Sequence, residues 1–214
     1  MAQPLPYRDS GCRLCPRLAE FLDEARAKNP DWHNAPVNGY GPVSAPIMLV
    51  GLAPGMRGAN RTGRPFTGDF AGDLLFQMLD EFGLSSGTYQ ARPDDGVELH
   101  HIRIVNAVRC VPPQNKPVGA EINTCRQFLT QDIHAMPDLK VMITLGRIGH
   151  LSALKALGLR EKDYPFSHGG QHQLPSGIQL ISSYHCSRYN TQTGRLTTAM
   201  FRDVFEKATA AAGL

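Results

Sequence analysis

Four short, continuous apolar runs divide the chain into regularly spaced segments. They lie at residues 46–52, 102–108, 139–145 and 178–184. The first run ends at Ala53-Pro54-Gly55, and an apolar run of this length that stops at turn residues is typical of a buried strand. We therefore expect four strands at these positions.

Stretches with helical spacing or good helix formers come before and between the apolar runs. They cover residues 13–28, 69–82, 120–131, 147–157 and 196–212. The alternation implies crossover connections and an α/β fold with a mostly parallel sheet that helices cover on both faces. Its 214 residues fit one domain over residues 1–214, and the Gly-, Ser- and Asp-rich segment 85–98 is expected as a surface insertion.

Polar and Gly-rich residues follow three of the predicted strands. They are the loop 53–69, Asn106 near the end of the second strand, and His185 after the fourth. In an open parallel sheet the ligand site lies beyond the carboxyl ends of the strands. We therefore expect these three segments to meet at one edge of the sheet.

Charge alone does not identify a partner, because the net charge is only +3. The distribution says more, since arginines gather in the two polar loops: Arg57, Arg61 and Arg64 in one, Arg188 and Arg195 in the other. The planar guanidinium suits phosphate, so both loops are candidates for gripping a DNA backbone. Solubility is the alternative explanation for any surface arginine.

The chain shows no sign of a membrane or export segment. No apolar run approaches the roughly 20 residues that span a bilayer, and the opening MAQPLPYRDSGC has no basic segment followed by an apolar one. We expect a cytoplasmic protein with no membrane partner.

Five cysteines are present, and four of them form two pairs far apart in the sequence. Cys12 and Cys15 form a C-x2-C pair, whereas Cys110 and Cys125 are 15 positions apart. In a cytoplasmic chain paired thiols indicate metal or redox chemistry. The wide second pair favours a 4Fe-4S cluster over a zinc ribbon, although zinc and four unrelated buried cysteines stay open as alternatives.

Long motifs in both polar loops give the chain a family resemblance. The segments GLAPG, NRTGRPFTGD, NAVRC and H-x-S-x-x-N-x-x-T-G-R-L-T resemble those of type 5 uracil-DNA glycosylase, the iron-sulfur branch of the uracil-DNA glycosylase superfamily. Cys12, Cys15, Cys110 and Cys125 match that branch's cluster ligands in order and approximate spacing. The resemblance extends from Cys12 to the final helical segment.

The resemblance implies a three-layer α/β/α fold around a four-stranded parallel sheet. It also implies a monofunctional base-excision repair enzyme that flips uracil out of double-stranded DNA and hydrolyses its N-glycosidic bond, leaving an abasic site. Other deaminated bases, such as hypoxanthine and xanthine, are further expected substrates, and we expect a monomer. The alternative is a non-catalytic iron-sulfur protein that binds nucleic acid or transfers electrons.

Individual roles follow from the same resemblance. Phe66 would stack on the flipped base, and Asn106 would hydrogen-bond the uracil edge, whose donors and acceptors an amide complements. His185 would donate to the base oxygen O2, where negative charge grows as the bond breaks. The loop 187–195 would enter the DNA groove. Further substrate contacts are expected from Ala53, Gly55 and Arg188.

Two features of the motifs affect the expected chemistry, and the first of them belongs to the type 5 pattern. The GLAPG motif holds Leu52 and Ala53 where other branches carry a carboxylate, so the candidates for positioning water are Asn60 and Asp69, with Asn106 assisting. Asp69 fits a helix cap equally well.

The one departure from the family is a cysteine near the expected site. After His185 the family usually has proline, whereas this chain has Cys186, which leaves the loop less restricted. We expect that Cys186 is not a cluster ligand.

Overall fold

The computed structural model describes residues 11–214. Most of the segment considered for an export signal, residues 1–10, lies outside the described residues. The helices are α1 Pro16–Lys28, α2 Ala59–Thr62, α3 Phe70–Glu81, α4 Gly119–His134, α5 Gly146–Ala156, α6 Arg188–Gln192 and α7 Thr198–Ala212, with short 3-10 turns at Pro113–Asn115 and Glu161–Asp163. The strands are β1 Ile47–Gly51, β2 Ser85–Ser86, β3 Glu98–Leu99, β4 Ile102–Asn106, β5 Val141–Leu145, β6 Gln171–Gln173 and β7 Gln179–Ser183.

The main sheet has five strands in the order β4-β1-β5-β7-β6. The four predicted strands pair in parallel, as expected, and β6 adds an antiparallel edge to β7. The sequence did not reveal β6 because Gln171-His-Gln is short and polar, without the apolar run that marks a buried strand. An edge strand can be polar because one of its sides remains open to solvent.

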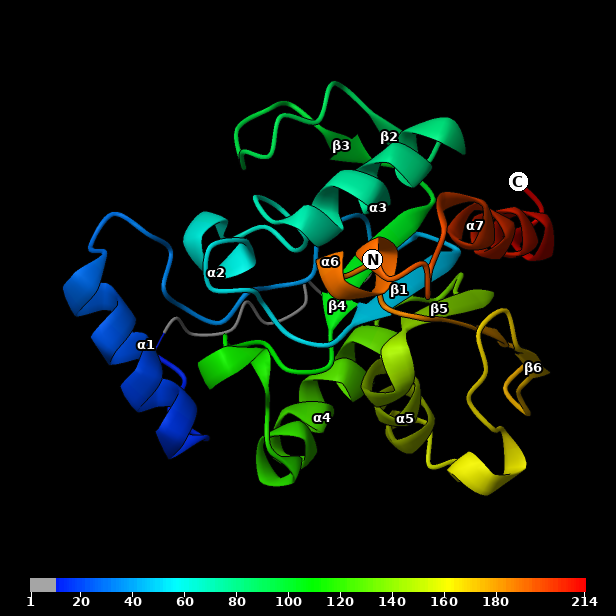
Figure 1. Cartoon of the computed structure of the whole chain (residues 1–214). Coiled ribbons are helices and arrows are strands. Elements are labelled where there is room, and N and C mark those ends of the chain that lie inside the picture. Colours follow the sequence, from blue (N-terminus) through cyan, green and yellow to red (C-terminus); the bar gives the residue numbers. More distant parts are fainter. Residues whose placement is uncertain (1–10) are drawn as a thin grey trace.

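Helices cover both faces of the sheet, so the predicted α/β/α sandwich is confirmed (Figure 1). Alternate residues of β1 face opposite layers. Ile47 and Leu49 pack in the cluster that contains residues of α3 and α7, whereas Met48 and Val50 pack with residues of α4 and α5. Because β1 is buried on both faces, its sequence is continuously apolar rather than alternating.

A third apolar cluster attaches α1 to the side of the sandwich. Leu18 and Leu22 of α1 pack with Val108, Val111 and the two later cysteines of the expected cluster set. This packing brings the N-terminal C-x2-C segment next to α4. No helix among residues 11–214 is long and apolar enough to cross a membrane.

Candidate active site

A cavity of about 510 Å³ opens at the carboxyl edge of the sheet. The expected convergence is confirmed, because segments after β1, β4 and β7 all line it. Seven of the predicted site residues lie on its wall: Ala53, Gly55, Phe66, Asp69, Asn106, His185 and Arg188. The cavity is large enough for a planar heterocyclic base with part of its sugar.

Asn106 ends β4 and presents an unsatisfied amide to the cavity. Its side chain is 3% exposed, and its Oδ1 atom has no hydrogen-bond partner among the described residues. A buried polar atom without a partner is costly unless a ligand satisfies it. Gly51 provides the space for this amide, because a Cβ there would lie 2.4 Å from Oδ1.

His185 comes two residues after the end of β7 and lines the cavity. Burial lowers the pKa of its imidazole to about 4, so the ring is neutral near pH 7 and offers one N–H donor and one acceptor. Its Nδ1 atom has no partner among residues 11–214, while its main-chain carbonyl accepts from Asn190 Nδ2 at 2.8 Å. The ring therefore has hydrogen-bonding capacity left for a ligand.

Phe66 forms an aromatic wall beside these two groups. Its ring lies 6.0 Å from the His185 ring with an interplanar angle of 25°, and a Cβ at Gly51 would come within 2.8 Å of its Cζ atom. Its φ angle is +54°, a left-handed conformation that costs a bulky residue on the order of 1–3 kcal/mol. Such strain persists only where surrounding contacts fix the backbone.

Asp69 fulfils the capping role that the sequence offered and also lines the cavity. Its Oδ1 atom accepts from Gly72 N at 3.2 Å at the start of α3. Its Oδ2 atom points towards Gly55 and Gly58, where an added Cβ would lie 2.9 and 2.3 Å away. Burial raises the pKa of this carboxyl above its ordinary value. The cap occupies one oxygen, and the other lies beside Gly55, which lines the cavity.

Asn60 lies apart from the other predicted site residues. It is fully buried in α2, and its Nδ2 atom donates to Asn34 Oδ1 at 2.9 Å and to Met56 Sδ at 3.6 Å. It does not line the cavity. Its proposed part in positioning water remains a prediction.

The sequence missed two contributors to the wall. The first residues of α5, directly after β5, add Gly146, Arg147 and Ile148, and Asn115 reaches the cavity from the segment between the last two cluster candidates. Asn115 has a φ angle of +56°, which asparagine adopts more readily than most residues. The contribution of the start of α5 could have been predicted, because β5 also ends at the same sheet edge.

One arginine expected to face DNA is not available for it. Arg64 is 6% exposed and forms a two-pronged ion pair with Asp95, with both N–O distances 2.7 Å. Its neighbours Arg57 and Arg61 are exposed. Arg188 lies over the Phe70 ring at 5.2 Å, at the rim of the cavity. The DNA-gripping prediction therefore fails for Arg64 and stays open for the exposed arginines.

The four candidate cluster cysteines line one small pocket: Cys12, Cys15, Cys110 and Cys125. In the described part of the chain, no three His, Cys, Asp or Glu side chains lie close enough together to hold a metal ion. The pocket is otherwise lined mainly by apolar side chains such as Leu18 and Phe128. Four thiols in apolar surroundings are a donor set that suits an iron-sulfur cluster or zinc.

Cys186 lies elsewhere, in the apolar layer under α3 and α7. It is fully buried and donates to Ala71 O at 3.5 Å. Burial raises the pKa of its thiol to about 12, so the reactive thiolate is scarce near neutral pH. The thiol adjoins the active-site loop, but it is shielded from ligands.

The lowered pKa of His185 predicts a specific pH dependence of stability. An unfolded imidazole titrates near 6.5, whereas the folded ring titrates near 4. Between these values the unfolded chain binds the extra proton, so the free energy of unfolding should fall as pH drops from about 6.5 to 4. His185→Gln should remove part of this fall.

Urea denaturation at several pH values between 4.5 and 7.5 measures this effect. His134→Gln, at an exposed position near the end of α4, is the matched control and should retain the wild-type slope. Equal slopes in wild type and His185→Gln would contradict the assignment.

Comparisons with known proteins agree with this geometry. The family model described as the uracil DNA glycosylase superfamily matches residues 38–209. A type-5 uracil-DNA glycosylase of Thermus thermophilus is 44% identical over 211 residues, covering 96% of this chain and 95% of the relative. One from Mycobacterium leprae is 39% identical over 96% of this chain and 93% of its own length. A type-4 uracil-DNA glycosylase of Sulfurisphaera tokodaii is 40% identical, over 80% of this chain and 74% of that protein.

Proposed function

The chain belongs to the type-5 branch of the uracil-DNA glycosylase superfamily, and we propose that it excises uracil from DNA by hydrolysing the base–sugar bond. The observation that carries the proposal is the meeting of Phe66, Asn106 and His185 on one cavity. Together they offer a stacking surface, an unsatisfied amide and a neutral imidazole. A base must leave the helix to reach such a cavity, because its glycosidic bond is inaccessible inside the stack.

We propose that Asn106 recognises the edge of the flipped base. The free Oδ1 acceptor would take the N3–H donor of uracil, and the amide nitrogen of the same group would donate to O4. Binding would thereby satisfy an atom that is buried without a partner. Phe66 would stack on the base. Ala53 and Gly55, which follow β1, would contact the base from the cavity wall.

His185 would stabilise the departing base. Negative charge grows on O2 as the glycosidic bond breaks. A neutral imidazole N–H placed there stabilises this charge in the transition state by donating a hydrogen bond. Because the pKa of His185 is lowered to about 4, the ring would act as a hydrogen-bond donor across the neutral range. It would not need to deliver a full proton.

Asp69 is our candidate for orienting the attacking water. Its Oδ2 atom lies beside Gly55 and Gly58 on the cavity side, whereas Asn60 is engaged with Asn34 behind the wall. A carboxylate at this point would also favour positive charge developing on the sugar. Asn106 would assist as the neighbouring amide.

The two roles of Asp69 are separable by substitution. Asp69→Asn keeps a capping side chain but loses the charge, so uracil release should fall at least about tenfold while the melting temperature changes little. Asp69→Ala should lose both activity and about 1 kcal/mol of stability. Single-turnover release rates and thermal unfolding measure the two effects.

Thr197→Ala is the matched capping control, since Thr197 caps α7 by accepting from Met200 N. It should lose about 1 kcal/mol of stability and keep its activity. Full activity in Asp69→Asn would show that Asp69 caps α3 but does not orient the attacking water.

We propose that Cys12, Cys15, Cys110 and Cys125 hold a 4Fe-4S cluster. Their shared, largely apolar pocket supports this, and zinc is the alternative. Such a cluster when bound supplies a cross-link and the capacity for one-electron transfer. The two helices that flank this pocket are also joined directly, because Arg17 of α1 donates to both oxygens of Glu121 of α4 at 2.7 and 2.8 Å.

We further propose that the substrate is double-stranded DNA and that a monomer acts on it, in the cytoplasm. Exposed arginines on two loops and the 70% exposed Tyr189 on α6 would contact the backbone and the groove. Residues 1–214 would act as one glycosylase domain. Hypoxanthine and xanthine are further proposed substrates, because the first motif lacks a carboxylate that would narrow the pocket.

The direct test is base release from duplex DNA that carries one uracil opposite guanine, scored as strand breakage after alkali. We expect breakage with uracil, then with hypoxanthine in the same position, and none with the undamaged duplex. If protein that binds this DNA leaves every damaged base in place, the non-catalytic iron-sulfur alternative replaces the proposal.

A further inference from the structure

Phe66, the proposed stacking residue, depends on contacts from a distant segment to keep its backbone in place. Its φ of +54° is unfavourable for an aromatic residue. The Phe66 ring faces the cavity. The main-chain carbonyl of Phe66 lies so close to α3 that a Cβ at Gly72 would be 1.9 Å from its oxygen. A small backbone shift would therefore move the ring within the cavity wall.

Tyr89 contacts the backbone at this strained residue and two positions after it. Its hydroxyl donates to Phe66 O at 3.2 Å and accepts from Gly68 N at 3.3 Å. The Tyr89 ring stacks on Phe76 of α3, with centroids 4.1 Å apart and planes 8° apart. Burial raises the pKa of Tyr89 to about 12, so the hydroxyl keeps the proton that it donates.

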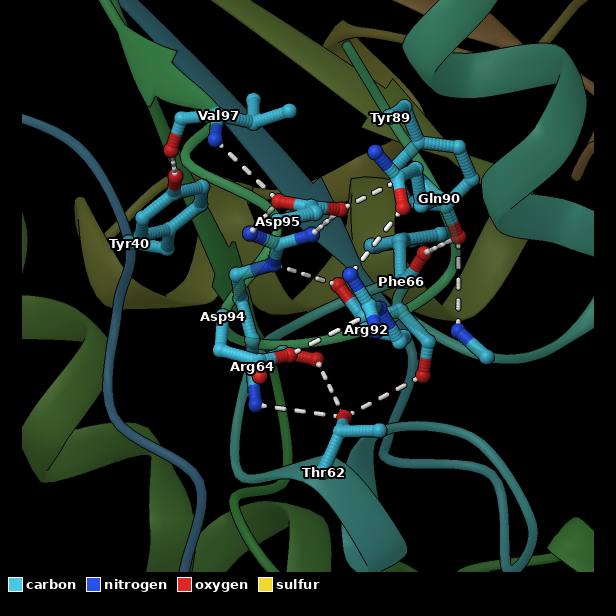
Figure 2. Close-up of polar contacts among 12 residues, drawn as sticks. Tyr40, Thr62, Arg64, Phe66, Tyr89, Gln90, Arg92, Asp94, Asp95 and Val97 are labelled. Carbon is cyan, nitrogen blue, oxygen red and sulfur yellow. Dashed lines mark hydrogen bonds and ion pairs between the residues drawn. The ribbon is translucent and has the colours of Figure 1, made fainter. Parts of the chain in front are cut away.

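Tyr89 is in turn fixed by an ion pair that starts two residues before Phe66 (Figure 2). The Arg64 guanidinium donates through both terminal nitrogens to Asp95 at 2.7 Å, and its Nε donates to Thr67 Oγ1 at 2.8 Å. The Asp95 carboxylate also accepts from Gln90 N at 3.0 Å, next to Tyr89. Arg64 thus joins Thr67, the residue that follows Phe66, to the segment that carries Tyr89.

The interior around this ion pair makes it rigid. The Asp95 side chain is fully buried, and the Arg64 guanidinium holds the pKa of that carboxyl well below its usual range. Aromatic rings surround the guanidinium, with the Tyr40 centroid at 5.4 Å and the Phe76 centroid at 5.3 Å. A two-pronged pair in such surroundings has little freedom to change geometry.

We propose that Arg64, Asp95 and Tyr89 are positioning residues that set the stacking surface of Phe66 and so determine how well the enzyme holds a flipped base. None of these three side chains lines the cavity, so they act through Phe66. The proposal rests on the proposed function, because it assumes that a base occupies the cavity. Segment 85–98 is then part of the substrate-recognition apparatus rather than a plain surface insertion.

The test compares the affinity of the full-length protein for two duplexes. One carries a 2′-fluorinated deoxyuridine, whose glycosidic bond resists cleavage, and the other carries an abasic site at the same position. Tyr89→Phe removes only the hydroxyl, and should weaken binding of the fluorinated duplex about fivefold, as part of the stacking energy is lost. Binding of the abasic duplex should not change. Arg64→Lys, which cannot form the two-pronged pair, should act in the same direction.

A second comparison distinguishes positioning from general destabilisation. In a Phe66→Ala background the same Tyr89→Phe change should have no further effect on the fluorinated duplex, since the group it positions is gone. Tyr164→Phe is the matched control, because its ring packs under the opposite face of the sheet. It should bind both duplexes as wild type does.

Equal weakening for both duplexes, or an undiminished effect in the Phe66→Ala background, would overturn the positioning role. Failure of the proposed function looks different. Wild type would then bind the fluorinated duplex no better than the abasic or undamaged one, whatever the variants do.

Discussion

Asn106→Ala and His185→Ala are each expected to slow uracil release by about 100- to 1000-fold, the usual cost of removing one preorganised group that acts on the transition state. Asn106 has the stronger structural basis, because its Oδ1 atom is buried and has no partner among residues 11–214. Alanine removes that acceptor and leaves the recognition edge of the base unpaired. His185→Ala removes the donor to the leaving group.

The two variants should differ in which step of the reaction they impair, substrate binding or the chemical step. Loss of Asn106 should weaken both ground-state binding and the chemical step, because the base edge is contacted throughout. Loss of His185 should chiefly lower the single-turnover rate at saturating enzyme, since its hydrogen bond strengthens as charge develops. His185→Gln, which keeps an N–H donor, should recover part of the rate.

Matched controls for these variants are available on α4. Asn123→Ala and His134→Ala remove an amide and an imidazole at exposed positions, and both should release uracil at the wild-type rate. If either Asn106→Ala or His185→Ala keeps more than about a tenth of the wild-type rate, the residue replaced contributes less than a group that stabilises the transition state. The cavity assignment would then be wrong for that residue.

Much of this architecture could be predicted because buried parallel strands leave a clear signal. The four apolar runs located β1, β4, β5 and β7, and the positions of Asn106 and His185 after their strands placed both at one edge. The strand signal depends on burial on both faces, so it failed for the polar edge strand β6.

Long-range polar pairing was beyond the reach of local patterns. Arg64 belongs to a loop with other arginines, and nothing in the local sequence separates it from exposed Arg61. Its burial depends on Asp95, 31 positions away. For the same reason, the sequence predicted segment 85–98 to be a surface insertion. A loop rich in Gly and Asp gives no apolar signal even when one carboxylate is fully buried.

Asp69 shows a different limit. A residue that follows glycine and precedes an amphipathic run fits a cap, and the structure confirms the cap. The second oxygen on the cavity side could not be inferred, because it depends on the close approach of Gly55 and Gly58. A single carboxylate serves both local helix geometry and the wall of the site.

The last prediction concerns the cysteine pocket, where substitution should change composition as well as stability. Cys110→Ser is expected to lower bound iron from about four atoms per chain to less than about one, with loss of the brown colour. Cys110 and Cys125 pack with Leu18 and Leu22 of α1, so a lost cluster also loosens α1. Substitutions that remove a bound metal are among those that can lower the free energy of unfolding by more than about 4 kcal/mol.

Cys186→Ser is the matched control, because it makes the same chemical change in a thiol that lines no part of that pocket. A serine hydroxyl can keep the hydrogen bond to Ala71 O, so the variant should lose at most about 1–3 kcal/mol of stability and should keep its iron and colour. Iron content and unfolding free energy, measured on the same preparations, separate the two variants. Loss of iron in Cys186→Ser would make this cysteine a ligand, whereas a colourless wild type that holds one zinc would favour the zinc alternative.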